Sequence, residues 1–246
     1  MTNNNPISDV NTVKLLGGRI IIPIADKRLL QYSKHEVYVG FDDCTSVNDV
    51  VTLDDIEASK RIFSMIDQHG YGESAEILSS AQIRSWLEKV PDADIAQITD
   101  AEWASIKKDI RGLLASFLSI SHVGLAKGGK IIHLKRPHLV PILDSYVVNL
   151  LTGVNPGNVY SKSSLLNLGM HALEIARDDI RNNPTFFSSE NKMISDLPIP
   201  ISFARIYDIL CWTHWKWDLK ELRKTTRWIR TANGYRRKDG YLEDEQ

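Results

Sequence analysis

Cysteine is scarce in this chain of 246 residues, and the two that occur, Cys44 and Cys211, lie far apart in the sequence. Two distant thiols supply neither a CxxC metal site nor the ligands of an iron–sulfur cluster, and they form no disulfide framework. We therefore expect two buried or partly buried thiols, no iron–sulfur cluster, no metal and no cofactor.

Long apolar runs are also lacking, since none reaches the ~18–20 residues that a membrane-spanning helix needs. The first residues, MTNNNPISDV, are polar and lack the charged-then-apolar pattern of a secretion signal. The composition, 43% hydrophobic and 25% charged, is that of an ordinary globular protein. We expect a cytoplasmic monomer with no membrane partner.

The net charge of −1 hides a strong asymmetry along the chain. Residues 1–104 carry 9 Lys and Arg against 17 Asp and Glu, a balance of −8, and residues 105–246 carry 21 against 14, a balance of +7. A basic half of this kind either faces a polyanion or pairs with the acidic half of its own chain. Both alternatives stand at this point.

The expected fold is mainly α with a small N-terminal β element. Residues 18–24 and 36–41 are rich in β-branched and aromatic residues, which favours strands. Apolar residues at helical spacing, in places after a capping Thr, predict the remaining elements. These are helices over residues 52–66, 74–89, 99–118, 125–136, 145–151, 163–181, 201–217 and 219–230.

The residues most informative about function lie between positions 118 and 151. A helix ends at the sequence SISHVG, the next begins at Leu125, and Gly124 stands at the junction. Free amides at a helix N-terminus, with the positive end of the helix dipole, form a site suited to a phosphate. The second helix has four Lys or Arg and no acid, and Asp144 follows at the expected start of another helix.

This arrangement resembles the helix-hairpin-helix DNA glycosylases of base excision, the HhH-GPD superfamily. Their hairpin glycines are followed, after a second helix and a proline-containing link, by an apolar-Asp-Thr/Ser-x-Val segment. Here Ile120 to Gly124 fill the hairpin, and Asp144 with Ser145 follows twenty residues later (144 − 124). The resemblance implies a two-lobed helical fold. It also implies that Asp144 stabilises positive charge on the deoxyribose and orients a water molecule as the base leaves.

Two residues depart from the family pattern. His122 replaces the first hairpin glycine. Ala126 stands where strand-cleaving members have a lysine that forms a Schiff base, and a helix turns the neighbouring Lys127 away by about 100°. The resemblance therefore implies a monofunctional DNA glycosylase, an N-glycosyl hydrolase without lyase activity. Family members mostly remove damaged or modified bases, and a few bacterial relatives act on modified phage DNA, which would be antiviral defence.

DNA is the partner that the resemblance implies, with the target base flipped out of the stack. Phosphate contacts are expected from His122, Val123, Gly124, Lys127, Lys130, Lys135 and Arg136. The expected border of the base pocket is formed by Tyr146, His138 and Trp212. A further basic stripe contains Lys220, Arg223, Lys224, Arg227 and Arg230.

With this interpretation the chain divides into four parts. They are a polar tail (1–11), an acidic N-terminal lobe of short strands and then helices (12–103), the helix-hairpin-helix and catalytic-Asp segment (104–160), and C-terminal helices with the basic stripe (161–246).

The same residues also have structural interpretations. Asp144 can be only the N-cap of its helix, and the basic helix can be a solvated face. Trp212 and its aromatic neighbours are more often core, and Arg205 with Asp208 at i,i+3 is expected to form a local ion pair. The rival hypothesis is therefore a helix-hairpin-helix DNA-binding protein without catalysis.

Overall fold

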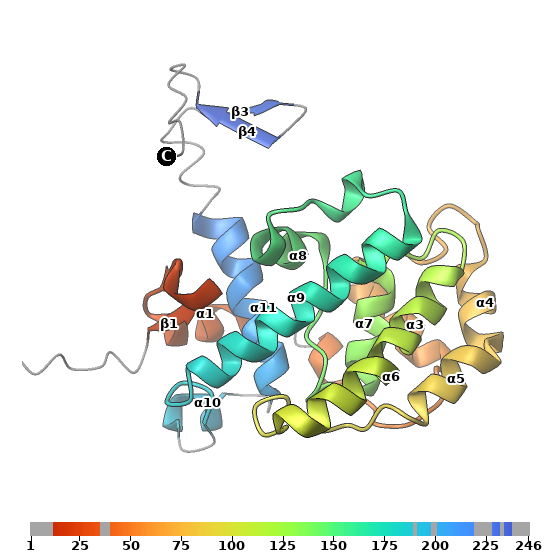
Figure 1. Cartoon of the computed structure of the whole chain (residues 1–246), viewed down its shortest axis with the longest axis horizontal. Coiled ribbons are helices and arrows are strands. Elements are labelled where there is room, and N and C mark those ends of the chain that lie inside the picture. The colour runs from red at the N-terminus through yellow and green to blue at the C-terminus, as the bar shows by residue number, and fades with distance from the viewer. Residues whose placement is uncertain are drawn as a thin grey trace, which may run out of the picture.

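The computed structural model describes residues 12–34, 40–188, 191–197, 201–218, 228–231 and 234–237. Within these ranges it contains ten α-helices and two antiparallel pairs of short strands. The protein is therefore mainly helical with a small sheet near the N-terminus, as the sequence predicts (Figure 1). None of the helices in these ranges has both the length and the apolar character to cross a bilayer.

The N-terminal sheet is a hairpin of two strands. The sequence predicted a single strand over residues 18–24, which contains β2 (Ile20–Ile22), and β1 (Val13–Leu15) was not predicted. β1 pairs with β2, and the 3-10 turn Leu16–Gly18 joins them. Leu16, Gly17 and Gly18 all have positive φ, which reverses the chain within three residues. Most of the expected strand over 36–41 lies outside the described residues, and its last residue, Phe41, is helical.

The predicted helices from residue 52 to 217 occur in the expected order with shifted ends, whereas α1 (Ala25–Tyr32) and α10 (Lys192–Ser195) were not predicted. Thr52 and Thr99 each form a capping box, as the sequence indicates. The helix after Thr52 stops early, because Phe63 and Met65 take left-handed backbone conformations. The helix expected over 74–89 is two helices, since Ser80 is extended and caps the second of them.

The bounds of the helices are as follows. They are α1 (Ala25–Tyr32), α3 (Leu53–Arg61), α4 (Glu73–Ser79), α5 (Ala81–Leu87), α6 (Asp100–Ser119), α7 (Leu125–Lys135), α8 (Ser145–Thr152), α9 (Lys162–Asn182), α10 (Lys192–Ser195) and α11 (Phe203–Thr213).

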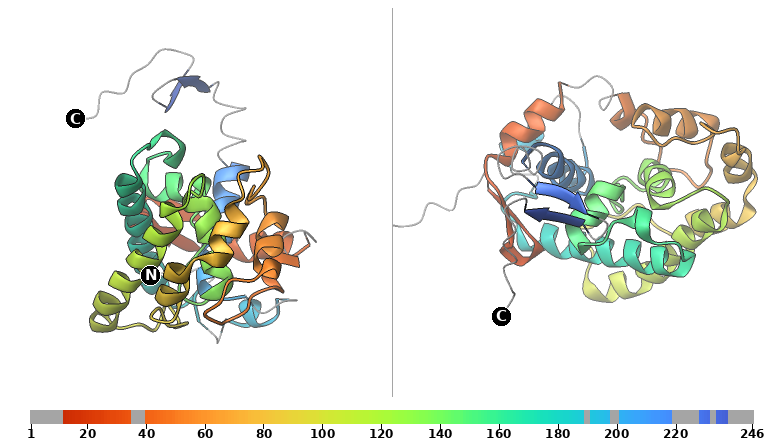
Figure 2. Two further views of the ribbon diagram at one scale, coloured as in Figure 1. Left: turned by 90° about the vertical axis from the view of Figure 1, so that its right-hand side faces the viewer. Right: turned by 90° about the horizontal axis from the view of Figure 1, so that it is seen from above.

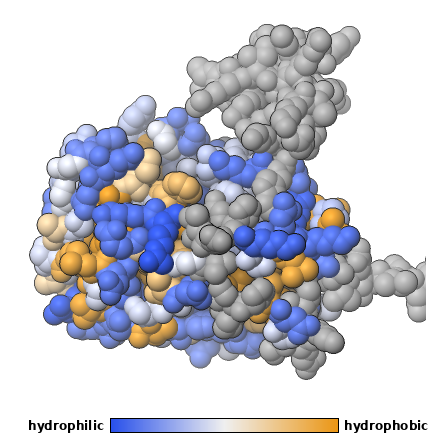
Figure 3. All heavy atoms as spheres, turned by 180° about the vertical axis from the view of Figure 1, so that it is seen from behind, coloured by the Kyte–Doolittle hydropathy of each residue, from blue (hydrophilic) through white to orange (hydrophobic). Residues whose placement is uncertain are grey.

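The core lies between the long helices. α6 packs against α5, α7 and α9, and α11 packs against α1, α8 and α9. α9 runs along one outer face of the body, and the N-terminal hairpin and α4 with α5 lie at opposite ends (Figures 1 and 2). Cys211 is buried in this core and Cys44 is half-buried, as expected for free thiols. Hydrophilic and hydrophobic residues are intermixed on the coloured part of the face in Figure 3.

The C-terminal basic helix was predicted over 219–230, and the described part of that segment contradicts it. α11 continues into the π-helical turn His214–Asp218, and residues 219–227 lie outside the described residues. Trp228–Thr231 (β3) is a strand that pairs with Gly234–Arg237 (β4). Alternating β-branched residues before an Asn-Gly pair are a hairpin signal, which the charge spacing obscured. Of the stripe, only Arg230 is described, and it lies on β3.

Candidate functional site

The predicted hairpin joins α6 to α7. α6 ends at Ser119 and α7 begins at Leu125, with Gly124 as an extended N-cap that offers no side chain to the helix. His122 has a φ of 61°, a left-handed conformation that glycine adopts without strain. Its exposed ring stacks on Tyr71 with the ring centroids 3.8 Å apart. His122 thus has the left-handed backbone conformation that glycine readily adopts, and its ring adds a contact to the segment before α4.

The glycine pair inside α7 allows close packing on two sides. A Cβ on Gly128 would lie 2.9 Å from the Cβ of Phe117 in α6. A Cβ on Gly129 would lie 3.2 Å from the backbone nitrogen of Leu143. Both distances are shorter than ordinary contacts, so α7 fits between α6 and the link that precedes α8 only without these side chains. The pair therefore fixes the position of Asp144 relative to the hairpin helix.

Asp144 is the N-cap of α8. Its Oδ1 accepts hydrogen bonds from the backbone N–H groups of Tyr146 at 2.8 Å and Val147 at 2.9 Å. Burial raises the pKa of Asp144, and the two N–H groups together with the charge of Lys130 oppose that shift. The cap holds the carboxylate in one orientation, and its Oδ2 takes no part in the cap.

Asp144 borders a pocket of about 350 Å³. This volume lies in the ~300–1,000 Å³ range of small-molecule sites, and the lining is mainly apolar and aromatic with a few converging charges, as such sites are. Ala126 reaches the pocket from α7, Tyr146 from α8 and Trp212 from α11. Asp144, Tyr146 and Trp212 thus line one pocket, and their roles stay a prediction.

Lys130 brings an ammonium group to the same pocket. It lies one helical turn after Ala126, so both side chains are on one face of α7. Its Nζ donates to the carbonyl oxygens of Ile62 at 2.8 Å and Phe63 at 3.1 Å. Burial lowers the pKa of Lys130 to about 8, and the nearby carboxylate of Asp144 opposes this shift. Lys130 therefore links α7, the segment after α3 and Asp144.

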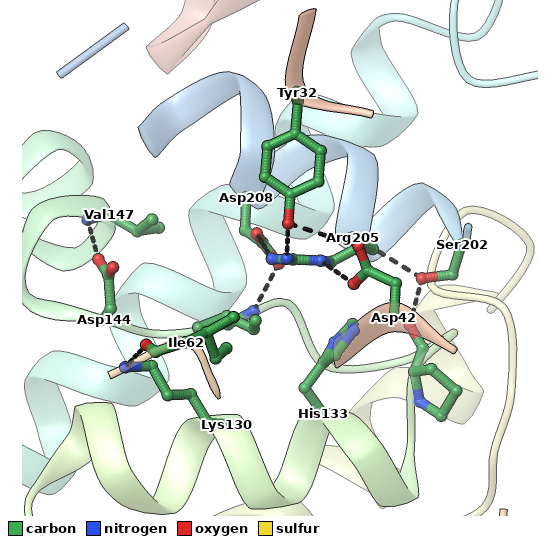
Figure 4. A network of polar contacts seen from close by, with 12 residues as sticks. Tyr32, Asp42, Ile62, Lys130, His133, Asp144, Val147, Ser202, Arg205 and Asp208 are labelled. Atoms are coloured by element: carbon green, nitrogen blue, oxygen red, sulfur yellow. Dashed lines mark hydrogen bonds and ion pairs between the residues drawn. The ribbon is translucent and has the colours of Figure 1, made fainter. Parts of the chain in front are cut away.

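The floor of the pocket is a buried polar network around Arg205 (Figure 4). Its Nε donates to Asp42 Oδ1 at 2.6 Å, its Nη1 to Asp208 Oδ1 at 2.5 Å, and its Nη2 to the hydroxyl of Tyr32. Asp208 Oδ2 also accepts from the backbone N–H of Ile142 at 2.9 Å. Burial opposes the charge of Arg205, but these two carboxylates raise its pKa above the ordinary value. The predicted Arg205–Asp208 ion pair is confirmed.

The cations of α7 do not form the exposed basic face that the sequence predicted. Lys127 Nζ lies 2.5 Å from Oε1 of the buried Glu73. Lys130, Lys135 and Arg136 are themselves buried. Lys135 Nζ lies 2.6 Å from Asp55 Oδ2, and Arg136 Nη2 lies 2.5 Å from Asp49 Oδ1. The expected phosphate contacts of the three buried cations therefore have no support in the structure, because their donors are used inside the fold.

His138, predicted at the border of a base pocket, does not line this pocket. Its Nδ1 is 2.7 Å from Asp92 Oδ2, and this hydrogen bond raises the pKa of the exposed imidazole. Within the described part of the chain, no group of three or more His, Cys, Asp or Glu side chains is arranged to hold a metal ion.

Sequence reasoning missed several residues of the pocket. Asp208 and Arg205 were recognised only as a local pair, because spacing on one helix does not reveal what the helix faces. Lys216 was not singled out, yet its Nζ donates to the hydroxyl of Tyr146 at 3.0 Å and lies 4.1 Å from the centroid of that ring. Tyr32 comes from a segment with no motif at all.

The fold and site together define a mainly helical protein with a carboxylate-bearing pocket beside α7. The chain belongs to the family described as "Family of unknown function (DUF6308)", which matches residues 24–215. No curated protein and no solved structure matches the chain.

Proposed function

We propose that this protein is a monofunctional DNA glycosylase of the helix-hairpin-helix type, which flips a base out of DNA and hydrolyses its N-glycosidic bond. The observation that carries the proposal is the meeting of Asp144 and Ala126 in one pocket directly behind the hairpin. In the glycosylase pattern, these two positions flank the reacting sugar. Residues of the N-terminal elements and of α11 line the pocket together, which supports the two-lobed arrangement of that fold.

The chemistry needs little beyond a fixed carboxylate. As the base departs, positive charge develops on the deoxyribose, and Asp144 in its ionised form stabilises that charge. The free Oδ2 accepts a proton from the water that attacks the sugar carbon. The aromatic rings of Tyr146 and Trp212 provide the stacking surface that a flipped base requires.

The DNA strand is held by the hairpin itself in this proposal. The N-terminus of α7 has no side-chain cap, so its first amides can donate to a phosphate. Lys216, at the pocket beside Tyr146, is the cation best placed to contact a neighbouring phosphate. The target base can be a damaged base of the host or a modified base of phage DNA.

The second candidate is a helix-hairpin-helix DNA-binding protein without catalysis. It is favoured by one observation, the two cap hydrogen bonds that Asp144 makes to α8. These bonds give the carboxylate a structural purpose of its own.

Asp144→Asn separates the two candidates. Asparagine is as good an N-cap as aspartate, so the fold should stay intact while the charge is lost. Incubation with genomic and phage DNAs, followed by detection of free base and of abasic sites, should show at least about a hundredfold less release by the variant.

Thr99→Ala serves as the control, since it removes the cap of α6 and leaves the pocket untouched. It should lose about 1 kcal/mol of stability and keep its activity. Undiminished release by Asp144→Asn would reject Asp144 as the catalytic residue. No release from any DNA by the wild-type protein would reject the enzyme and leave the DNA-binding protein.

A further inference from the structure

Asp208 is a second carboxylate at the pocket, and the proposed reaction does not use it. It lies in the middle of α11, its side chain is only 3% exposed, and it contributes to the pocket floor. The ion pair with Arg205 compensates the charge of this buried carboxylate, so what it can offer a ligand in the pocket is its remaining acceptor capacity.

The position of Asp208 is fixed from several sides. Its two oxygens accept from Arg205 Nη1 and from the backbone N–H of Ile142. Arg205 is in turn held by Asp42 and Tyr32, so the carboxylate cannot turn away from the pocket. Each carboxylate oxygen has about two acceptor sites, and one on each remains for a ligand.

The pocket is lined by two carboxylates, Asp144 and Asp208, and by three cations, Lys130, Arg205 and Lys216. Lys130 donates to two backbone carbonyls and Lys216 to Tyr146, so Arg205 is the cation that pairs directly with Asp208. Burial raises the pKa of Asp208 to about 7, and the charges of Asp42 and Asp144 act in the same direction. A ligand that places an N–H donor against the remaining acceptor sites of Asp208 stabilises its ionised form.

We propose that Asp208 selects a base that carries an exocyclic amino group on the edge inserted into the pocket. The amino group donates to the free acceptor sites of the carboxylate. A carbonyl oxygen in the same place would face a carboxylate oxygen with no proton between them. The kind of ligand, a nucleobase, rests on the proposed function, whereas the preference for an amino group rests on Asp208 alone.

Pairs of free bases that differ at this group test the proposal. Cytosine is compared with uracil, and adenine with hypoxanthine, by calorimetry and thermal shift at about pH 8, above the pKa of about 7. The amino member of each pair should bind at least about tenfold more tightly, as expected for a hydrogen bond to a charged acceptor. At ten times its Kd it should raise the Tm by about 3–6 °C.

Asp208→Asn should reduce the preference to within about threefold, because the amide accepts from an amino group and donates to a carbonyl equally well. The matched control is Asp42→Asn, which also removes a buried carboxylate from Arg205 but does not touch this pocket. It should be destabilised to a similar degree and keep the preference for amino bases.

The outcomes separate this inference from the proposed function. Equal binding of both members of each pair, no binding of any base, or an unchanged preference in Asp208→Asn would each overturn it. A clear amino preference without base release from any DNA would reject the glycosylase and leave the assignment of Asp208 standing. Release of bases without an amino preference would reject the assignment alone.

Discussion

Lys135 Nζ lies 2.6 Å from Asp55 Oδ2, and both side chains are buried. The pair joins α7, from the basic half of the chain, to α3, from the acidic half. The pairs Lys127–Glu73 and Arg136–Asp49 also join the basic half of the chain to its acidic half. Of the two explanations for the charge asymmetry, internal pairing therefore accounts for the cations of the hairpin helix.

The first prediction concerns the stability that this pair provides. Lys135→Met leaves Asp55 buried without its cation, which should cost about 3–5 kcal/mol in the free energy of unfolding measured with urea. The control is Lys60→Met, which breaks the more exposed pair with Glu57 and should cost less than about 1 kcal/mol. If both variants lost less than about 1 kcal/mol in the free energy of unfolding, the Lys135–Asp55 pair would be solvated in solution.

Local signals in the sequence predicted the fold well. The capping boxes at Thr52 and Thr99, the hairpin turn and the N-cap at Asp144 all depend on residues within a few positions of one another. The early end of α3 escaped prediction, because its cause is the backbone conformation of Phe63 and Met65. The β3–β4 hairpin was missed because the spacing of its charges also fits a helix.

The candidate site was only partly predictable. Asp144, Tyr146 and Trp212 share one pocket, since the first two stand at the start of α8 and the third lies on α11, which packs against α8. The solvation of charged residues could not be read from the sequence. A lysine-rich helix without acids has the same pattern whether it faces DNA or, as Lys135 does, a carboxylate eighty residues away (135 − 55).

The second prediction uses the charge of Lys130. Its ammonium group favours the ionised form of Asp144, so Lys130→Met should raise the pKa of Asp144 further. If ionised Asp144 is needed for base release, the acid limb of the pH–rate profile should move to higher pH. Lys127→Met is the matched control, since that cation pairs with Glu73 and should leave the limb in place. If the acid limb has the same pH midpoint in both variants as in the wild type, Lys130 does not lower the pKa of Asp144.

The third prediction concerns stability in acid. Burial lowers the pKa of His133 to about 3, so between that value and its unfolded value of about 6.5 the unfolded chain binds one more proton there. The contribution of His133 to stability is therefore present above about pH 6.5 and is lost as the pH falls. Asp208, with its pKa raised to about 7, acts in the opposite sense.

His133→Gln isolates this effect, because glutamine can still donate to the carbonyl of Val140 and does not titrate. Urea unfolding between about pH 4 and pH 7 should show a shallower loss of stability toward acid in the variant than in the wild type. Parallel curves would mean that His133 is protonated in the folded protein.

The last prediction is that the reaction leaves an intact abasic site. Ala126 lines the pocket and supplies no amine, while Lys127 is held by Glu73 and does not line it. Lys130 does line the pocket, but two carbonyl groups hold its ammonium. The labelled strand should therefore break only after hot alkali. Ala126→Lys places an amine beside the sugar and should give an adduct that borohydride traps, as a Schiff base would. A trapped adduct in the wild type that disappears in Lys130→Met would instead make Lys130 the nucleophile and the enzyme a lyase.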